Sequence, residues 1–294
     1  MAKAKSAIRL FLTSAAFMLL ISACGNAEKP AEESEYQIPA EYKKLSKAEQ
    51  AAKLPPVFAE MCEFESAGLI KEALSLGADP NAMSQDGGSP YLTALMHAMD
   101  SESEAEAKAA LLLEAGADPD RPDYLGQRAL HYAVAKNNAA LIELLLKHRA
   151  DINAPDEMGN TPLIAAADML RYWSDAEQTA MLKLLLANGA DVNKADNSNV
   201  TALAVVAGYG GPDILEPLIK AGADLNAAGS GQVTPLMAAA TKNPNPESVR
   251  LLLARGADPN LRDSEGNTAL EMSQFNPDKA AVAEMTAILE EAMQ

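Results

Sequence analysis

Short apolar blocks alternate with polar turns along most of the chain, and the alternation returns at a nearly fixed distance. Residues 123–153 hold one complete period. Turn-forming residues at 123–127 precede a block of small and apolar residues at 128–135, which predicts a short helix. Two asparagines break the pattern, and the apolar side of residues 140–147 is broad enough for burial on two flanks. Each period therefore predicts a pair of helices closed by a turn.

The end of each period carries the string Gly-Ala-Asp-(Pro/Val/Leu)-(Asn/Asp). Complete copies begin at Gly77, Gly116, Gly189, Gly222 and Gly256, and a degenerate copy begins at Arg149. The steps between the alanines of successive copies are 39, 33, 40, 33 and 34 residues. A period in this range predicts a stack of small units, none of which buries its apolar face alone.

A second string opens the first helix of each period. It begins at Thr93, Arg128, Thr161, Thr201, Thr234 and Thr268 and continues as (Pro/Ala)-Leu. Thr suits the helix cap and Pro the first helical turn, while the Gly of the other string suits the left-handed end of the second helix.

The two strings together resemble the ankyrin repeat, whose consensus is Thr-Pro-Leu-His-x-Ala followed by Leu-Leu-Leu-x-x-Gly-Ala-Asp-x-Asn. The resemblance covers residues 54–294. It implies an all-α solenoid of about seven helix-turn-helix units with β-turn or hairpin fingers. The first unit (55–81) and the last (263–294) are expected to be caps, with Glu284, Glu290 and Glu291 facing water.

Several units depart from the consensus. Arg149 takes a glycine slot, where a positive φ costs a non-glycine residue about 1 kcal/mol. Pro217 falls inside the second helix of the fifth unit, so we expect this unit to be the least stable. The second and fourth units are long, and we expect the extra residues, 100–106 and 170–177, to lie between the two helices.

The N-terminus has the pattern of an export signal. Three cationic residues precede a 12-residue apolar run at 10–21, which ends in Ile-Ser-Ala before Cys24. This resembles a bacterial lipoprotein signal, which implies cleavage before Cys24 and acylation of that residue. An ordinary secretory signal with an incidental Cys is the alternative. The predicted parts are a signal peptide (1–23), the lipidated Cys24 with a flexible tether (24–54) and the repeat domain (55–294).

The expected location is the bacterial cell envelope, anchored by lipid and facing the periplasm. Asn26, at the second position after Cys24, is not the Asp that retains lipoproteins in the inner membrane, which favours the outer membrane.

The chain is strongly acidic, with 41 Asp and Glu against 24 Lys and Arg, three of which lie in the signal peptide. This excess argues against nucleic acid as a partner, since phosphate binding requires cationic residues. Solubility alone explains the acidity, and a basic partner is the second interpretation. After lipidation Cys62 is the one remaining thiol, and its apolar surroundings predict a buried, inert residue.

No catalytic motif occurs, so we expect no enzyme, no cofactor and no metal site. His131 fills the Leu-His slot of the resemblance and is expected to be structural. His97 lies one place after that slot and is expected to face the concave side.

The resemblance implies a concave groove built from turn tips and first helices, and this groove is the expected site of protein binding. The candidate contact residues are Tyr124, Tyr132, Lys136, Asp156, Glu157, Met158, Asp168, Tyr172, Trp173 and Tyr209. Aromatic side chains matter most at interfaces, and the aromatics at 124, 132, 172 and 173 come from adjacent units that favour a cluster. The alternative is that these are scattered surface residues without a role.

These features favour a membrane-anchored scaffold that binds another protein of the envelope. Two specific versions are an immunity protein that neutralises a toxin delivered to the periplasm and a partner of a periplasmic peroxide-defence enzyme. An enzyme or ligand carrier that uses residues 170–177, and a spacer without a specific partner, remain as alternatives.

Overall fold

The computed structural model describes residues 58–59, 62–63, 65–86, 89–101, 104–169 and 172–294. The predicted signal peptide, Cys24 and the tether lie outside the described residues. Among the described residues, no helix has the length and apolar character that a membrane span requires.

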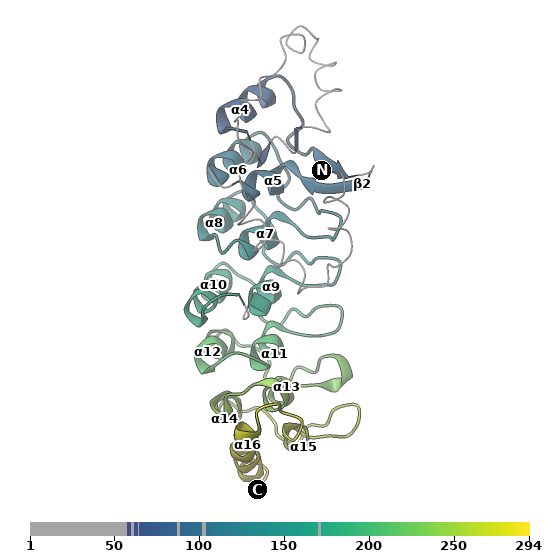
Figure 1. Cartoon of the computed structure of the whole chain (residues 1–294), viewed down its shortest axis with the longest axis vertical. Helices are drawn as coiled ribbons and strands as arrows, with labels where there is room; N and C mark the ends of the chain where they lie inside the picture. The colour runs from purple at the N-terminus through teal and green to yellow at the C-terminus, as the bar shows by residue number, and fades with distance from the viewer. Residues whose placement is uncertain (1–57, 60–61, 64, 87–88, 102–103, 170–171) are drawn as a thin grey trace. The chain divides into compact units, whose positions relative to one another are not determined.

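The repeats form two parallel columns of helices (Figure 1). The inner column contains the first helices of the units: α5 (Ala94–Asp100), α7 (Ala129–Ala135), α9 (Pro162–Asp168), α11 (Ala202–Ala207), α13 (Pro235–Lys242) and α15 (Ala269–Ser273). The outer column contains the second helices: α4 (Ala67–Ser75), α6 (Ala105–Glu114), α8 (Ala139–Lys147), α10 (Asp175–Ala187), α12 (Pro212–Lys220), α14 (Pro246–Ala254) and α16 (Lys279–Ala292). The predicted all-α repeat fold is confirmed.

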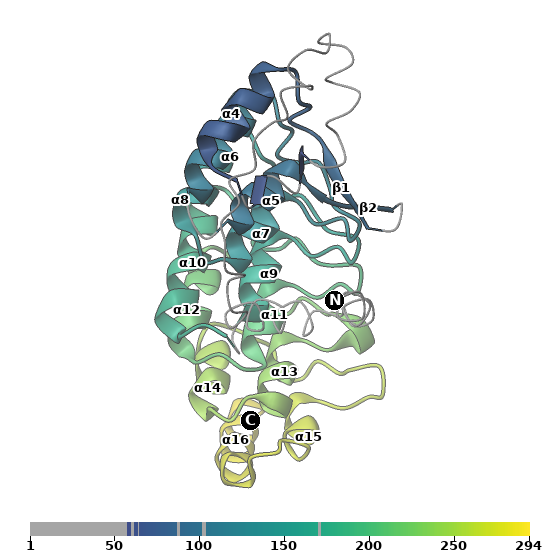
Figure 2. The same cartoon turned by 45° about the horizontal axis from the view of Figure 1, so that its top comes forward.

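Fingers project from the inner column between successive units (Figure 2). The finger before α5 is an antiparallel hairpin of β1 (Met83–Asp86) and β2 (Ser89–Thr93), and a short 3₁₀ turn, η3 (Ser230–Gln232), lies in the finger before α13. The other fingers between the described helices are turns.

The first helices begin as the threonine string predicts. The Thr161 hydroxyl accepts the backbone N–H of Ile164, and the threonines that precede α5, α11, α13 and α15 make the same bond. Arg128 has no such hydroxyl. There the Nδ1 of His131 accepts the Arg128 N–H at 3.2 Å, while its Nε2 lies 2.9 Å from the carbonyl oxygen of Asn160 in the next unit. His131 is therefore structural, as predicted.

The core lies between the two columns. Five inner helices, α5, α7, α9, α11 and α13, each contribute a leucine two residues after the cap position, and five outer helices, α6, α8, α10, α12 and α14, each contribute a leucine to the facing side. These leucines are at most 1% exposed: Leu95, Leu130, Leu163, Leu203, Leu236, Leu112, Leu145, Leu185, Leu218 and Leu252. Because each layer is covered only by its neighbours, burial couples every unit to the next.

A polar ladder joins the ends of the outer helices. The Nδ2 of Asn193 donates to the carbonyl oxygen of Gly222, and its Oδ1 accepts the N–H of Asp224 at 2.8 Å. Asn81 and Asn153 make the same two bonds to their next units. Asp120 holds the equivalent position and accepts the Asp151 N–H at 3.0 Å, but its carboxylate has no proton to donate to a carbonyl.

The fingers are also joined to each other by backbone bonds. Glu157 N–H donates to the Leu125 carbonyl at 3.1 Å, and Asn197 N–H donates to the Met158 carbonyl at 2.9 Å. Gly126 permits this approach, since its φ is +72° and an added Cβ would lie 2.6 Å from the backbone nitrogen of Glu157.

The extra residues of the fourth unit differ from the prediction. We expected all of residues 170–177 between the helices, but Ser174 caps α10 in a reciprocal capping box with Glu177, and the helix begins at Asp175. The insertion therefore lengthens α10 to 13 residues. Likewise, Ala105 and Glu106 of the other insertion belong to α6, and Asp100 belongs to α5.

The other predicted departures occur where the sequence places them. Arg149 has a φ of +66°, and α12 runs through the buried Pro217 without a break. At the end of the stack, α16 covers the last layer, and Glu284, Glu290 and Glu291 are exposed as expected for a cap.

Candidate functional site

Two neighbouring fingers, the one before α7 and the one before α9, carry candidate residues that lie close together. Tyr124 is 36% exposed and Met158 is 56% exposed, and Glu157, which precedes Met158, is also exposed. The Glu157–Leu125 backbone bond fixes the two fingers against each other. We call Tyr124, Glu157 and Met158 the finger patch. It combines an aromatic ring, a thioether and a carboxylate on adjacent turns.

Tyr132 is not part of this surface. It is only 6% exposed, and its hydroxyl donates to Asp123 Oδ2 at 3.2 Å. The prediction that Tyr132 faces the groove is wrong because α7 packs this ring against the base of the preceding finger. There the hydroxyl finds the partner that a buried tyrosine requires.

Two aspartates hold the finger turns. Oδ1 of Asp156 accepts the N–H groups of Met158 and Asn160, both at 2.8 Å. Asp156 therefore holds the backbone of the turn that carries Glu157 and Met158. Asp123 does the same for its own finger. Burial raises the pKa of Asp123 to about 6, against the opposing effect of the backbone bonds and the Tyr132 hydroxyl.

Lys136 lies at the end of α7 and forms an ion pair with Asp100 of α5 at 2.5 Å. Both side chains are about 30% exposed, so this pair bridges two inner helices at the surface. Lys136 is therefore accessible, although its charge is already matched by a carboxylate.

His97 does not face the concave side. It is 7% exposed, and its Nδ1 lies 3.1 Å from Glu63 Oε2 of the first unit. Lys108 is also buried at this joint, where its Nζ donates to the Glu63 carbonyl and the Ser101 hydroxyl, and burial lowers its pKa. The prediction for His97 is wrong because the capping unit covers that face of α5.

Tyr172, Trp173 and Tyr209 follow the ends of α9 and α11. Tyr172 is 46% exposed, Tyr209 is 45% exposed and Trp173 is half-buried. Asp168, the last residue of α9, is exposed. Because Tyr124 precedes α7 whereas Tyr172 follows α9, the two lie at opposite ends of the inner helices. The predicted cluster of four aromatics is therefore not formed.

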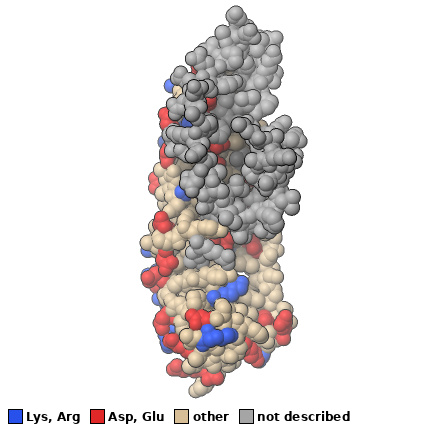
Figure 3. Space-filling view, in the orientation of Figure 1, with Lys and Arg blue, Asp and Glu red and all other residues tan. Residues whose placement is uncertain are grey.

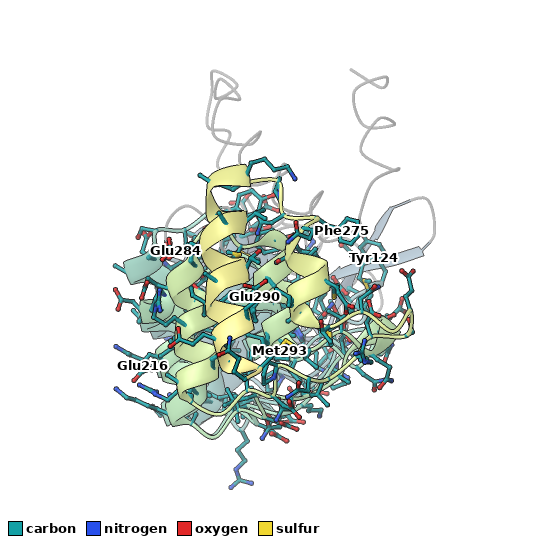
Figure 4. All side chains as sticks on the ribbon, turned by 90° about the horizontal axis from the view of Figure 1, so that it is seen from below. Tyr124, Glu216, Phe275, Glu284, Glu290 and Met293 are labelled. Atoms are coloured by element: carbon teal, nitrogen blue, oxygen red, sulfur yellow. The ribbon has the colours of Figure 1, made fainter. Side chains whose placement is uncertain are left out.

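Sequence reasoning missed Phe275, which is 72% exposed in the connection between α15 and α16. Figure 4 shows Phe275 and Tyr124 on one side of α16, with Glu216 and Glu284 on the other. The available signal was the Phe-Asn-Pro sequence at 275–277, where a large apolar residue stands in a predicted turn.

The described residues offer little for catalysis. They contain no group of three or more His, Cys, Asp or Glu side chains placed to hold a metal ion. Cys62 is buried, as predicted, and burial raises the pKa of its thiol to about 12, which disfavours the reactive thiolate. A recess of about 250 Å³ lies on the outer helices, lined by Thr179, Lys183, Asp213, Glu216, Pro217 and Lys220. It contains none of the described residues of the 170–177 insertion.

Comparison with known proteins connects this architecture with a large family. The family model described as ankyrin repeats (3 copies) matches residues 58–156, 110–196, 169–263 and 203–282. The Notch protein of Drosophila melanogaster is 38% identical over 106 residues, which are 36% of this chain and 4% of that protein. Human neurogenic locus notch homolog protein 4 is 47% identical over 57 residues, 19% of this chain and 3% of that protein.

A longer match has lower identity. The putative palmitoyltransferase ZDHHC13 of Danio rerio is 26% identical over 163 residues, 55% of this chain and 19% of that protein. The chain thus spans less than a fifth of the length of each of these relatives, and the similarity concerns their repeats.

Proposed function

The chain belongs to the ankyrin-repeat family, and on that premise we propose that it is a membrane-anchored scaffold that binds another protein of the bacterial cell envelope. Ankyrin repeats form scaffolds for protein–protein interaction, and the family is generally non-enzymatic. The finer part of the proposal concerns which residues bind and where the chain resides.

The finger patch is the observation that carries the proposal. Its Tyr124 ring and Met158 thioether are exposed at the tips of two fingers that backbone bonds join. Preformed apolar groups bind a partner at a small entropic cost, because little ordering remains to be done. Aromatic residues also contribute most to interface energy. We therefore assign the finger patch, which includes Glu157, as the first contact surface.

The anchoring part rests on the sequence alone. The cationic start, the apolar run at 10–21 and the Ile-Ser-Ala-Cys end support acylation of Cys24. A lipid anchor with more than one acyl chain holds a protein stably at a membrane. Growth with an alkyne-labelled palmitate tests this: the full-length chain should carry the label and Cys24→Ala should lose it. Equal labelling of both would contradict the anchor.

Site-directed photo-crosslinking in intact cells tests the contact surface. A benzoylphenylalanine in place of Tyr124 should give a discrete crosslinked product with one envelope protein. The same probe at Glu290, on the exposed outer side of α16, is the matched control and should give none. Crosslinking at position 290 without crosslinking at 124 would overturn the assignment.

The captured partner also separates the specific versions of this function. A secreted toxin would support an immunity role, and a peroxide-defence enzyme would support a role in stress protection.

A further inference from the structure

A second exposed row runs along the opposite ends of the inner helices, away from the fingers. Three of the large exposed side chains of the described residues lie there: Tyr172, Tyr209 and Phe275. They belong to the fourth, fifth and seventh units, and each lies in the connection from the first helix to the second. We call Tyr172, Tyr209, Lys242 and Phe275 the loop edge.

Three members of the loop edge occupy the same place in consecutive units. Tyr209, Lys242 and Phe275 immediately precede Gly210, Asn243 and Asn276. The Nδ2 of Asn276 donates to the carbonyl oxygens of Ala240 and Asn243, at 3.0 and 2.8 Å. The Nδ2 of Asn243 donates in the same way to the carbonyl oxygens of Ala207 and Gly210. These bonds align the three connections one above the other.

The alignment makes the loop edge rigid. Asn243 and Asn276 are fully buried, so their bonds to the preceding unit are shielded from water. A surface held by buried hydrogen bonds loses little entropy when a partner binds. The row also contains one cation–ring contact, since Lys242 Nζ lies 5.9 Å from the centroid of the Tyr209 ring.

Carboxylates surround one part of the loop edge, where Asp168, Asp175 and Asp213 are exposed next to the connections that carry Tyr172 and Tyr209. Near Phe275 both signs of charge occur: Glu247 pairs with Arg250, and Lys279 directs its Nζ to the carbonyl oxygens of Gln274 and Asn276. On the face that Figure 3 shows, acidic side chains gather along the rim of the lower units, and basic side chains form groups nearer the middle. Aromatic rings among carboxylates suit guanidinium and ammonium groups.

We propose that the loop edge binds an extended basic segment of a partner protein, whose Lys and Arg side chains pack on the rings of Tyr172, Tyr209 and Phe275. This proposal rests on the scaffold function and adds a second surface to the finger patch. Packed helices lie about 8–10 Å apart, so three steps from the fourth to the seventh unit span about 24–30 Å. A polyproline II segment rises about 3.1 Å per residue with three residues per turn, so about eight to ten residues cover the row and every third side chain faces it.

Fluorescence anisotropy with the full-length protein in detergent tests the proposal. The probe is a fluorescein-labelled decapeptide with Arg at every third position and small polar residues elsewhere. We expect binding to weaken about tenfold in the Tyr209→Ala, Phe275→Ala double variant. Replacing each ring by the other aromatic (Tyr209→Phe with Phe275→Tyr) should preserve it. Circular dichroism establishes that both double variants are folded.

Three controls decide between outcomes. A decapeptide with Glu in place of Arg should not bind, and a pentapeptide should bind at least tenfold more weakly because it reaches fewer rings. The Tyr124→Ala, Met158→Ala variant should bind the Arg decapeptide within twofold of the wild type. Binding that survives loss of both rings, or that depends on the finger patch instead, would overturn the proposal. Failure of crosslinking at Tyr124 alone would remove the finger assignment and leave the loop edge intact.

Discussion

The third and fifth units each fold as a pair of helices but depart from the repeat consensus in different places. The third unit departs at its boundaries: Asp120 takes the Asn position just before it, and Arg128 and Arg149 take the Thr and Gly positions within it. The fifth unit keeps the consensus at those positions and departs inside a helix, at Pro217. Part of the bonding at these positions is kept: the Arg128 N–H donates to Nδ1 of His131, and the Asp151 N–H still donates to Asp120.

The helix departure removes a bond within α12, since a proline nitrogen has no hydrogen to donate to the preceding turn. We therefore expect the proline inside the helix to cost more stability than the changes at the ends of the helices.

Amide exchange should show the largest difference between the two units. An interior proline costs a helix about 3 kcal/mol, which corresponds to roughly a hundredfold in exchange. We expect the amides of residues 214–220 to exchange about that much faster than those of residues 141–147 in α8. Hydrogen exchange followed by mass spectrometry measures both segments in one sample. Equal protection would show that packing around the buried Pro217 compensates for the lost bond.

The finger of the third unit and the finger of the last unit should contribute to stability with opposite dependence on pH. Burial raises the folded-state pKa of Asp123 to about 6 from 3.8, so the native state binds this proton more tightly than the unfolded state does. Stability from this group is therefore present below about pH 4 and lost as the pH rises to about 6, by about 3 kcal/mol. The free energies of unfolding of the wild type and of Asp123→Asn, measured with denaturant at several pH values, should diverge over that interval.

Asp263, at the base of the last finger, is the control. Backbone bonds lower its pKa, so its contribution has the opposite sign: it is present above the unfolded pKa and lost as the pH falls. If Asp263→Asn and Asp123→Asn change the pH profile in the same direction, burial does not distinguish the two fingers.

Restoring glycine after α8, at the end of the third unit, should stabilise the protein by about 1 kcal/mol. Arg149 has a φ of +66°, where a side chain is strained, and Arg149→Gly removes that strain. The matched change is Gly222→Ala in the fifth unit, where φ is +89° and an added Cβ meets nothing within 4 Å. It should destabilise by a similar amount, about 1 kcal/mol, through the backbone alone. Urea midpoints of both variants test the pair.

Asp120→Asn should give the smallest gain, about 0.5–1 kcal/mol, by adding a donor toward the Arg149 carbonyl. The reverse change, Asn193→Asp, should remove the bond to Gly222 and cost a similar amount. Thermal unfolding of the two variants measures these changes. A loss of stability in Asp120→Asn would show that its carboxylate is preferred at this joint.

Much of the fold could be predicted because it depends on local rules. The threonine caps, the prolines at first turns and the glycines at helix ends each act on their own few residues. The candidate site was predictable only in part. Tyr209, beyond the end of α11, is exposed, whereas Tyr132, inside α7, is buried. The Tyr132 hydroxyl donates to Asp123, and sequence spacing does not reveal that contact.

The sequence by itself determined the repeat period, the helix pairs, their caps and the strained joint at Arg149. These follow from hydrogen bonds and backbone angles that a residue makes with close neighbours in the chain. The tertiary structure alone decided that His97 is covered by the first unit and that Phe275 joins the loop edge. Exposure is a property of what the adjacent unit covers, so it is settled only when the units are stacked.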